Sequence, residues 1–372
     1  MTRKLLPAMI GTILVGGMAT AQADVTLFGQ IDESINRIDD LNGNSDTRLV
    51  CTTCSLGVKG SEDLGNGLKA IFKLDWQYNI NERNTSKASA KTTRTTTIGG
   101  SIVTNITDVS DDSTFTDRDQ WLGLAGNFGQ VRVGTISTTY KSTGAMLDPG
   151  YRTVAQMRDA GIQSGLHSGA GTNGQGRAEN TARYDSPSWN GLKFAATFTL
   201  SPENENDNEN PYSAGLSYEN GGILLFGNYI TNERGGDNSA WKVGGKYTLN
   251  NFSVFGQFEK DGGLITARRR GTIKSDNSLN GDDANQWMAG ASYTMGNNMI
   301  YAAYAAAEGM SGNAAAAAQP AFGNDDYKAY EIVGIHNMSK RTFLYAGYVK
   351  TDPDQSGVDD TTIWTSGVRH KF

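Results

Sequence analysis

One pattern repeats along most of this sequence. Stretches of roughly ten residues alternate apolar and polar side chains, and a turn or loop then interrupts them. In GLKFAATFTL, for example, Leu192, Phe194 and Phe198 share one face, and Lys193 and Thr197 lie on the other. Alternation with a period of two over this length predicts β-strands with one apolar face. Any fold for this chain must therefore place many strands between an apolar and a polar environment.

The interruptions come in two sizes that alternate along the chain. Short breaks such as ENGG and MGNN separate one pair of strands, and long polar loops such as 79–118 and 137–176 separate the next. Seven short turns and eight long loops join about sixteen strands. Short turns at one end and long loops at the other are typical of outer-membrane barrels, whose strands span the bilayer with roughly 9–11 residues.

A closed barrel also explains why the polar faces carry charges. In a bilayer every backbone amide needs a partner, so a spanning sheet must close on itself. A barrel of about sixteen strands is too wide for side chains to fill, and its interior holds water. Lys69, Lys73 and Asp75 alternate with apolar residues and are expected to face that water. The sequence thus predicts an all-β, 16-stranded antiparallel transmembrane β-barrel. The alternative, a large soluble sandwich or propeller, would need more apolar residues or a blade-length motif.

The N-terminus predicts export. Two basic residues precede an apolar run over 5–18, and AQA at 21–23 is a small-x-small cleavage pattern. The run is short for a spanning helix, so a retained anchor is the weaker alternative. We expect a cleaved signal peptide over 1–23, with cleavage between Ala23 and Asp24 and one barrel domain over 24–372. The chain has no basic stripe, so no nucleic-acid partner is expected.

The two cysteines form the motif CTTC at Cys51–Cys54. An exported protein meets an oxidising compartment, where a local disulfide persists. In a straight strand residues three apart face opposite sides, so this disulfide requires a turn at Thr52–Thr53. A structural loop disulfide at the outer end of the second strand is the main expectation, and free thiols are the alternative. A redox or metal site would need a helix N-terminus or further ligands, so no metal or cofactor is expected.

Several segments resemble the Gram-negative general diffusion porins, most closely the proteobacterial trimeric type. They are VTLFGQID, LGVKGSEDLGNGLKAIF, WLGLAGNFGQVRVG, YDSPSWNGLKF and the final GVRHKF, in that order along the whole chain. The resemblance implies an outer-membrane homotrimer with a water-filled channel for passive diffusion of ions and small hydrophilic solutes. It implies short periplasmic turns, long extracellular loops, and a third loop, 137–176, folded into the lumen. It also implies contact with lipids and lipopolysaccharide, and insertion machinery that reads the terminal Phe372.

Two other functions stay open at this point. A substrate-specific barrel channel for a sugar or an anion shares the same sequence pattern. A barrel enzyme would need a nucleophile with a histidine partner, and the sequence holds no G-x-S-x-G, P-loop or H-E-x-x-H motif, so no enzyme is expected.

The resemblance also assigns residues to the pore. It implies that acids on the third loop face basic residues on the wall, and such opposed charges sort solutes. The family's wall arginines are absent at Ser55 and Thr135, which predicts a mild preference for cations. The candidate lumen and constriction residues are Asp148 and Asp159 on the loop and Arg132, Arg177, Arg183, Lys59, Lys73 and Asp75 on the wall.

Overall fold

The computed structural model describes residues 24–40, 43–81, 92–98, 101–107, 115–167, 176–200, 210–232, 238–261, 285–308, 326–354 and 359–372. The predicted signal peptide, including Ala23, lies outside these residues, and the first strand begins at Asp24. Among the described helices, none has the length and apolar character needed to cross a membrane.

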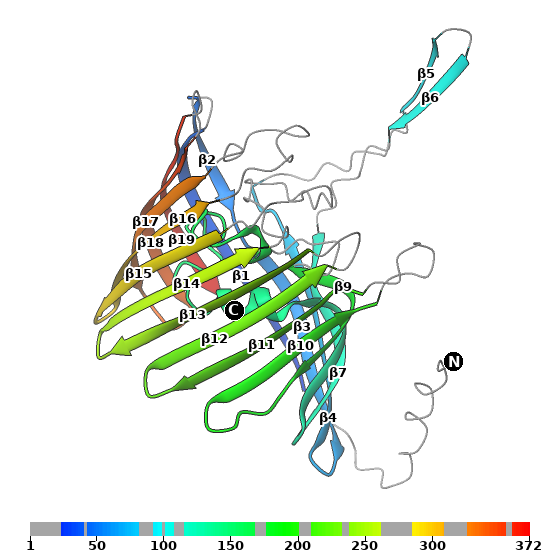
Figure 1. Cartoon of the computed structure of the whole chain (residues 1–372), viewed down its shortest axis with the longest axis vertical. Coiled ribbons are helices and arrows are strands. Elements are labelled where there is room, and N and C mark those ends of the chain that lie inside the picture. The colour runs from blue at the N-terminus through cyan, green and yellow to red at the C-terminus, as the bar shows by residue number, and fades with distance from the viewer. Residues whose placement is uncertain are drawn as a thin grey trace.

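A single large antiparallel sheet dominates the described chain (Figure 1). Its strands are β1 (Asp24–Asp39), β2 (Ser45–Cys51), β3 (Cys54–Gly65), β4 (Leu68–Tyr78), β7 (Phe115–Gly126), β8 (Gly129–Ser137), β9 (Arg177–Asp185), β10 (Leu192–Thr199), β11 (Tyr212–Asn220), β12 (Ile223–Asn232), β13 (Asn238–Leu249), β14 (Phe252–Asp261), β15 (Asn285–Met295), β16 (Asn298–Glu308), β17 (Tyr327–Asn337), β18 (Thr342–Pro353) and β19 (Thr361–Lys371). A separate hairpin, β5 (Thr92–Ile98) with β6 (Ser101–Thr107), belongs to the second long loop.

The sheet closes on itself. The last strand, β19, pairs with β1 from Gln30↔Lys371 to Asp39↔Thr362. The backbone of Phe372 extends this closure, because it exchanges hydrogen bonds of 3.2 and 3.1 Å with Gly29. A closed sheet leaves no edge with unpaired amides, which is the condition for spanning a bilayer. The predicted closed barrel is therefore confirmed.

Strands β2 and β3 are two parts of one barrel strand, because both pair with β1. Between the pairs Gln30↔Ser55 and Glu33↔Cys51 the second strand carries one extra residue, which makes a bulge at Thr52–Thr53. Counting β2 and β3 together gives the predicted sixteen strands. Cys51 and Cys54 form a disulfide across this bulge, with Cα atoms 5.8 Å apart. The disulfide lies opposite the middle of β1, so the expected position at the outer strand end was wrong.

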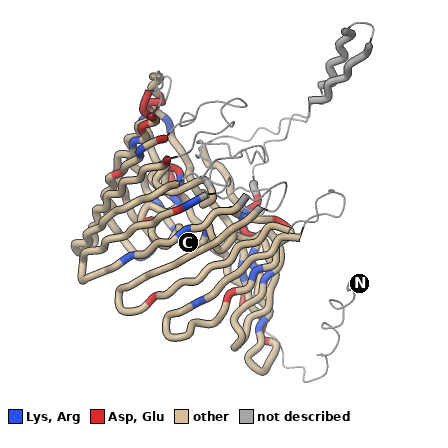
Figure 2. The backbone as a smooth tube through the Cα atoms, in the orientation of Figure 1, with Lys and Arg blue, Asp and Glu red and all other residues tan. Residues whose placement is uncertain are grey.

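The alternation read from the sequence separates the two faces of the wall. Trp241, Val243 and Tyr247 are exposed on the outer face. Thr197 lies on the opposite face from Phe198, is buried, and hydrogen-bonds Ser213 at 2.5 Å. Most of the wall is uncharged in Figure 2, and Lys, Arg, Asp and Glu stand close together on the strands that Figure 1 labels β3, β4 and β7.

The third long loop lies inside the barrel (Figure 1). It begins with helix α1 (Thr139–Gly144), whose cap residue Thr138 accepts a hydrogen bond from the Lys141 amide, and it includes the short 3-10 helix η2 (Gly165–His167). Wall side chains hold its backbone: Tyr301 donates to the Ala155 carbonyl at 3.2 Å and Thr351 to the Ala160 carbonyl at 3.1 Å.

An apolar core joins this loop to one side of the wall. Leu147, Val154, Met157 and Ile162 of the loop are nearly inaccessible and pack in one cluster with inward residues of β12 to β19. These loop residues pack against small wall side chains, which include Ala303, Ala305, Ala307, Ala329 and Val349. The loop thus fills one half of the lumen and leaves an opening on the other half.

Candidate functional site

The opening lies between the third loop and the wall formed by β7, β8 and β9. It is a cavity of about 260 Å³ lined by Asp119, Arg132, Ile136, Ser137 and Arg183 of the wall and by Lys141, Ser142, Ala145 and Tyr151 of the loop. Most of these side chains are polar or charged. The sequence places them here because inward positions of the wall strands carry polar residues while outward positions carry apolar ones.

A chain of ion pairs runs along the wall beside this opening. Asp75 lies 3.1 Å from the Lys73 ammonium and 3.3 Å from Nε of Arg118. Asp119 lies 3.4 Å from Lys73 and 2.9 Å from Nε of Arg177. Each carboxylate is therefore shared between two cations, and Lys73 contacts both of them.

A second group of charges connects the wall to the loop. Asp185 pairs with Arg183 at 2.7 Å and also pairs with Arg132. Arg183 donates in addition to the Ser137 carbonyl at 2.6 Å and to the Ser142 hydroxyl at 2.9 Å. Because Ser142 belongs to α1, this guanidinium spans the junction between wall and loop.

The charge balance of these two groups is positive. Their five cations are Lys73, Arg118, Arg132, Arg177 and Arg183, and their three acids are Asp75, Asp119 and Asp185. Lys141 is left out of this balance, because burial and the neighbouring Arg177 and Arg158 hold its pKa well below the usual range.

The loop side of the opening adds further guanidinium groups. Arg152 and Arg158 lie over the ring of Tyr151, 5.6 and 5.2 Å from its centroid. Arg369 of β19 donates to the carbonyl of the same tyrosine. These guanidinium groups surround Tyr151, which lines the opening, but they are not themselves among its lining residues.

Comparison with known proteins decides what kind of barrel this is. The profile of the Gram-negative porin family matches residues 8–356. The chain belongs to the Gram-negative porin family.

Named relatives agree with this assignment. The chain is 25% identical to the major outer membrane protein P.IB of Neisseria meningitidis serogroup B, over 98% of this chain and 99% of that protein. Its relative of the same name from Neisseria sicca is 27% identical, over 98% and 99% of the two chains. This protein is therefore an outer-membrane porin, located in the outer membrane of a Gram-negative bacterium.

Solved porin structures share the fold. The anion-selective porin from Comamonas acidovorans superposes with a TM-score of 0.66 at 21% identity, covering 94% of this chain and all of that one. The trimer form of OmpT from Vibrio cholerae gives a TM-score of 0.60 at 14% identity, covering 94% and 99% of the two chains. These likenesses support the architecture of the porin described above.

The structure brings most of the expected wall residues together. Arg132 and Arg183 line the opening, and Arg177, Lys73 and Asp75 belong to the chain of ion pairs beside it. Lys59 lies further along the same face, where its ammonium and that of Lys73 stand 5.6 and 5.4 Å from the Phe28 ring centroid.

The two loop acids are placed differently from the wall residues. Asp148 is only 7% exposed, and its carboxylate accepts a hydrogen bond of 3.0 Å from the Met157 amide within the loop. Burial raises the pKa of Asp148 to about 7. Asp159 accepts from the side chain of Gln156, also within the loop. Neither acid is among the residues that line the opening.

Sequence reasoning missed several residues of the site. Arg118 and Asp119 are adjacent in sequence yet both join the inner charge network, because the register between β4 and β7 shifts at Leu74–Trp76. Simple alternation cannot assign both to one face. Asp185 lies two residues after Arg183 in the same strand and so faces the same side, and the alternation of the strand could have predicted this. Tyr151 lies in the irregular loop, where no periodicity applies.

Proposed function

We propose that this porin is a homotrimeric channel for passive diffusion that passes anions in preference to cations. One observation carries the preference: every acid in the charge network beside the opening is shared by two cations, which leaves a surplus of positive charge. Rings of one charge sign favour ions of the opposite sign. Small ions and hydrophilic solutes suit a polar cavity of about 260 Å³.

This proposal differs from the cation preference expected from the sequence. That expectation placed Asp148 and Asp159 at the opening and counted two wall arginines as absent. In the structure both acids are engaged within the loop, and Arg118 joins the wall network as a cation that the expectation did not include. The selectivity of the porin from Comamonas acidovorans, named as anion-selective, supports the same direction.

Other parts of the proposal rest on the family. The trimer form of OmpT supports a homotrimer, and the apolar outer face of the wall suits contact with lipids and lipopolysaccharide. We infer that signal cleavage before Asp24 releases the barrel, and that the terminal Phe372, beside the closing strand pair, is read by the insertion machinery. The protein would then act as a channel, with no catalytic step.

The reversal potential of single channels in planar bilayers under a tenfold salt gradient tests the selectivity. We expect the sign of anion selectivity, with a smaller value at 1 M than at 0.1 M salt, because screening lengths fall from about 10 to about 3 Å. A reversal potential with the cation sign would overturn the proposed preference while leaving the porin fold and family untouched.

A further inference from the structure

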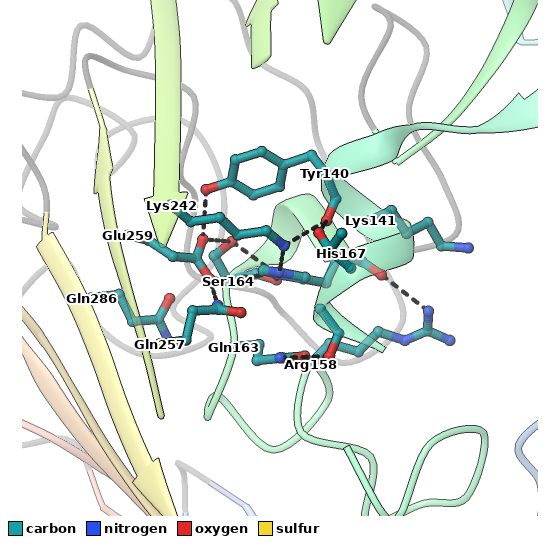
Figure 3. A network of polar contacts seen from close by, with 12 residues as sticks. Tyr140, Lys141, Arg158, Gln163, Ser164, His167, Lys242, Gln257, Glu259 and Gln286 are labelled. Carbon is teal, nitrogen blue, oxygen red and sulfur yellow. Dashed lines mark hydrogen bonds and ion pairs between the residues drawn. The ribbon is translucent and has the colours of Figure 1, made fainter. Parts of the chain in front are cut away.

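A buried polar cluster connects the third loop to the wall on the side away from the ion pairs of the opening. Tyr140, Ser164 and His167 of the loop meet Lys242 of β13 and Glu259 of β14 (Figure 3). His167 is 2% exposed, Glu259 1% and Lys242 0%. The chain has only three histidines, and the structure leaves the other two exposed.

Lys242 makes the closest contacts of the cluster. Its ammonium donates to the Tyr140 carbonyl at 2.5 Å, lies 2.6 Å from Nε2 of His167, and stands 4.2 Å from the Tyr140 ring centroid. An ammonium carries donors only, so Nε2 must accept and the imidazole must be neutral with its hydrogen on Nδ1. That nitrogen lies 3.2 Å from the Ser164 carbonyl, which can accept the hydrogen.

Glu259 completes the cluster from the neighbouring strand. Its carboxylate accepts hydrogen bonds from the Tyr140 hydroxyl at 3.1 Å and the Ser164 hydroxyl at 2.7 Å, and it also accepts from Gln257. Two loop segments, α1 and the turn before η2, are therefore tied to the same carboxylate. Because α1 also carries Ser142, which lines the opening, this cluster fixes the loop side of the channel.

We propose that Lys242 and Glu259 are positioning residues that hold the third loop at the opening, and that protonation of His167 releases this hold. A proton on Nε2 would turn this acceptor of Lys242 into a donor 2.6 Å from the ammonium. The hydrogen bond would be lost and two cations would be left in contact in a buried site, which is strongly unfavourable.

The surroundings of His167 agree with this direction. Burial and Lys242 hold the pKa of His167 well below its usual range, whereas an imidazole on a released loop would titrate normally. Acid therefore favours the released loop, by up to tenfold per pH unit below about 6.5. The titratable and charged groups packed around the ring are Lys242 of β13, Glu259 of β14, and Tyr140, Lys141 and Arg158 of the loop.

Thiol accessibility gives a direct test. Leu166 is 2% exposed and adjacent to His167 in the sequence. Its substitution by cysteine (L166C) introduces a single free thiol that can be labelled, because Cys51 and Cys54 already form a disulfide. The labelling rate of L166C porin would be measured from pH 7 to pH 5, with and without His167→Gln, while the same channels are recorded in bilayers. Asp148 titrates in both L166C proteins, with and without His167→Gln. The ratio of their labelling rates therefore reports the effect of His167 alone.

We expect this ratio to rise by up to roughly 15-fold between pH 6.5 and pH 5, with correspondingly more brief interruptions of the current in the wild type than in His167→Gln. The exposed histidine supplies the control, because H336Q should keep the wild-type profile. K242M should label quickly at every pH and keep only the pH dependence that Asp148 gives. A pH-independent ratio would overturn the role of His167, and slow labelling of folded K242M would overturn the positioning role. Neither result bears on the sign of the reversal potential, so anion preference stands or falls separately.

Discussion

The two halves of this barrel use the same strand pattern to make opposite interiors. Along β15 to β19 many inward side chains are small or apolar, among them Ala305, Ala329 and Val349, and they pack in one cluster with Met157 and Ile162 of the third loop. Glu331 of β17 and Arg369 of β19 are buried charged residues on the same strands. Along β4, β7, β8 and β9 many inward side chains are charged, and each acid of the ion pairs has two cationic partners. The comparison shows that alternation sets only which residues point inward. Whether an inward face lines water depends on whether the loop covers it.

The largest expected effect comes from placing a charge in the covered half. Val349→Asp would bury a second carboxylate opposite Glu331, which is already buried on β17, at a cost of about 3–5 kcal/mol. The loop should leave the wall while the barrel still closes, since backbone pairing is unaffected. Faster hydrogen exchange in loop residues 145–160 would show this, and Val349→Ala is the matched control. Unchanged hydrogen exchange in Val349→Asp would mean that water already reaches the side of the lumen that the loop covers.

A smaller effect is expected from Asp148, which lies within the loop on the covered side. Its pKa is raised from 3.8 to about 7, so the docked loop keeps a proton that a released loop would lose. The contribution of Asp148 to docking is therefore fully present below pH 3.8 and falls by up to about 4 kcal/mol as the pH rises to 7, which is opposite in direction to the effect of His167. Exchange of the Met157 amide, followed from pH 4 to pH 8 after correction for intrinsic rates, should show this loss. Asp148→Asn should remove the dependence, and an equally steep profile in that variant would exclude Asp148 as its source.

The disulfide lies on the strand between β1, which contacts the loop, and β4, which carries the charge chain. A link between residues only three apart constrains a short segment, so its removal should cost no more than about 2 kcal/mol. Alkylation of the unreduced protein followed by mass spectrometry should find no free thiol. The double variant Cys51→Ser with Cys54→Ser should melt only slightly earlier and keep both halves of the lumen intact. Two alkylated thiols in protein purified without reductant would rule out the disulfide.

The smallest effect in energy concerns the charged half. Arg132→Gln with Arg183→Gln leaves Asp185 unpaired at the opening and removes two of its cations. Relative ion barriers should change by about 1 kcal/mol, or roughly fivefold in the ratio of anion to cation permeability. The reversal potential measures this directly. Lys69→Gln, on the same inner face but exposed near the turn, is the control and should leave the potential nearly unchanged.

The sequence alone determined the barrel, because lipid demands alternation and complete backbone pairing, and both leave a pattern in the chain. Strand number and the outer face around Trp241 followed from that pattern, and the family resemblance together with the alternation placed Arg132, Arg177 and Arg183 on the inner face. The pattern did not predict the β-bulges. Arg118 and Asp119 join one ion-pair network only because the register between β4 and β7 shifts at that point.

Tertiary structure decided the rest, because it depends on contacts between segments far apart in the chain. The third loop has no periodicity, so nothing local indicated that Asp148 would be buried or that Tyr151 would line the opening. His167 and Lys242 are 75 residues apart and meet only because the loop folds back onto β13. The sequence thus specified a channel, while the folded loop determined how wide it opens and which charges an ion meets.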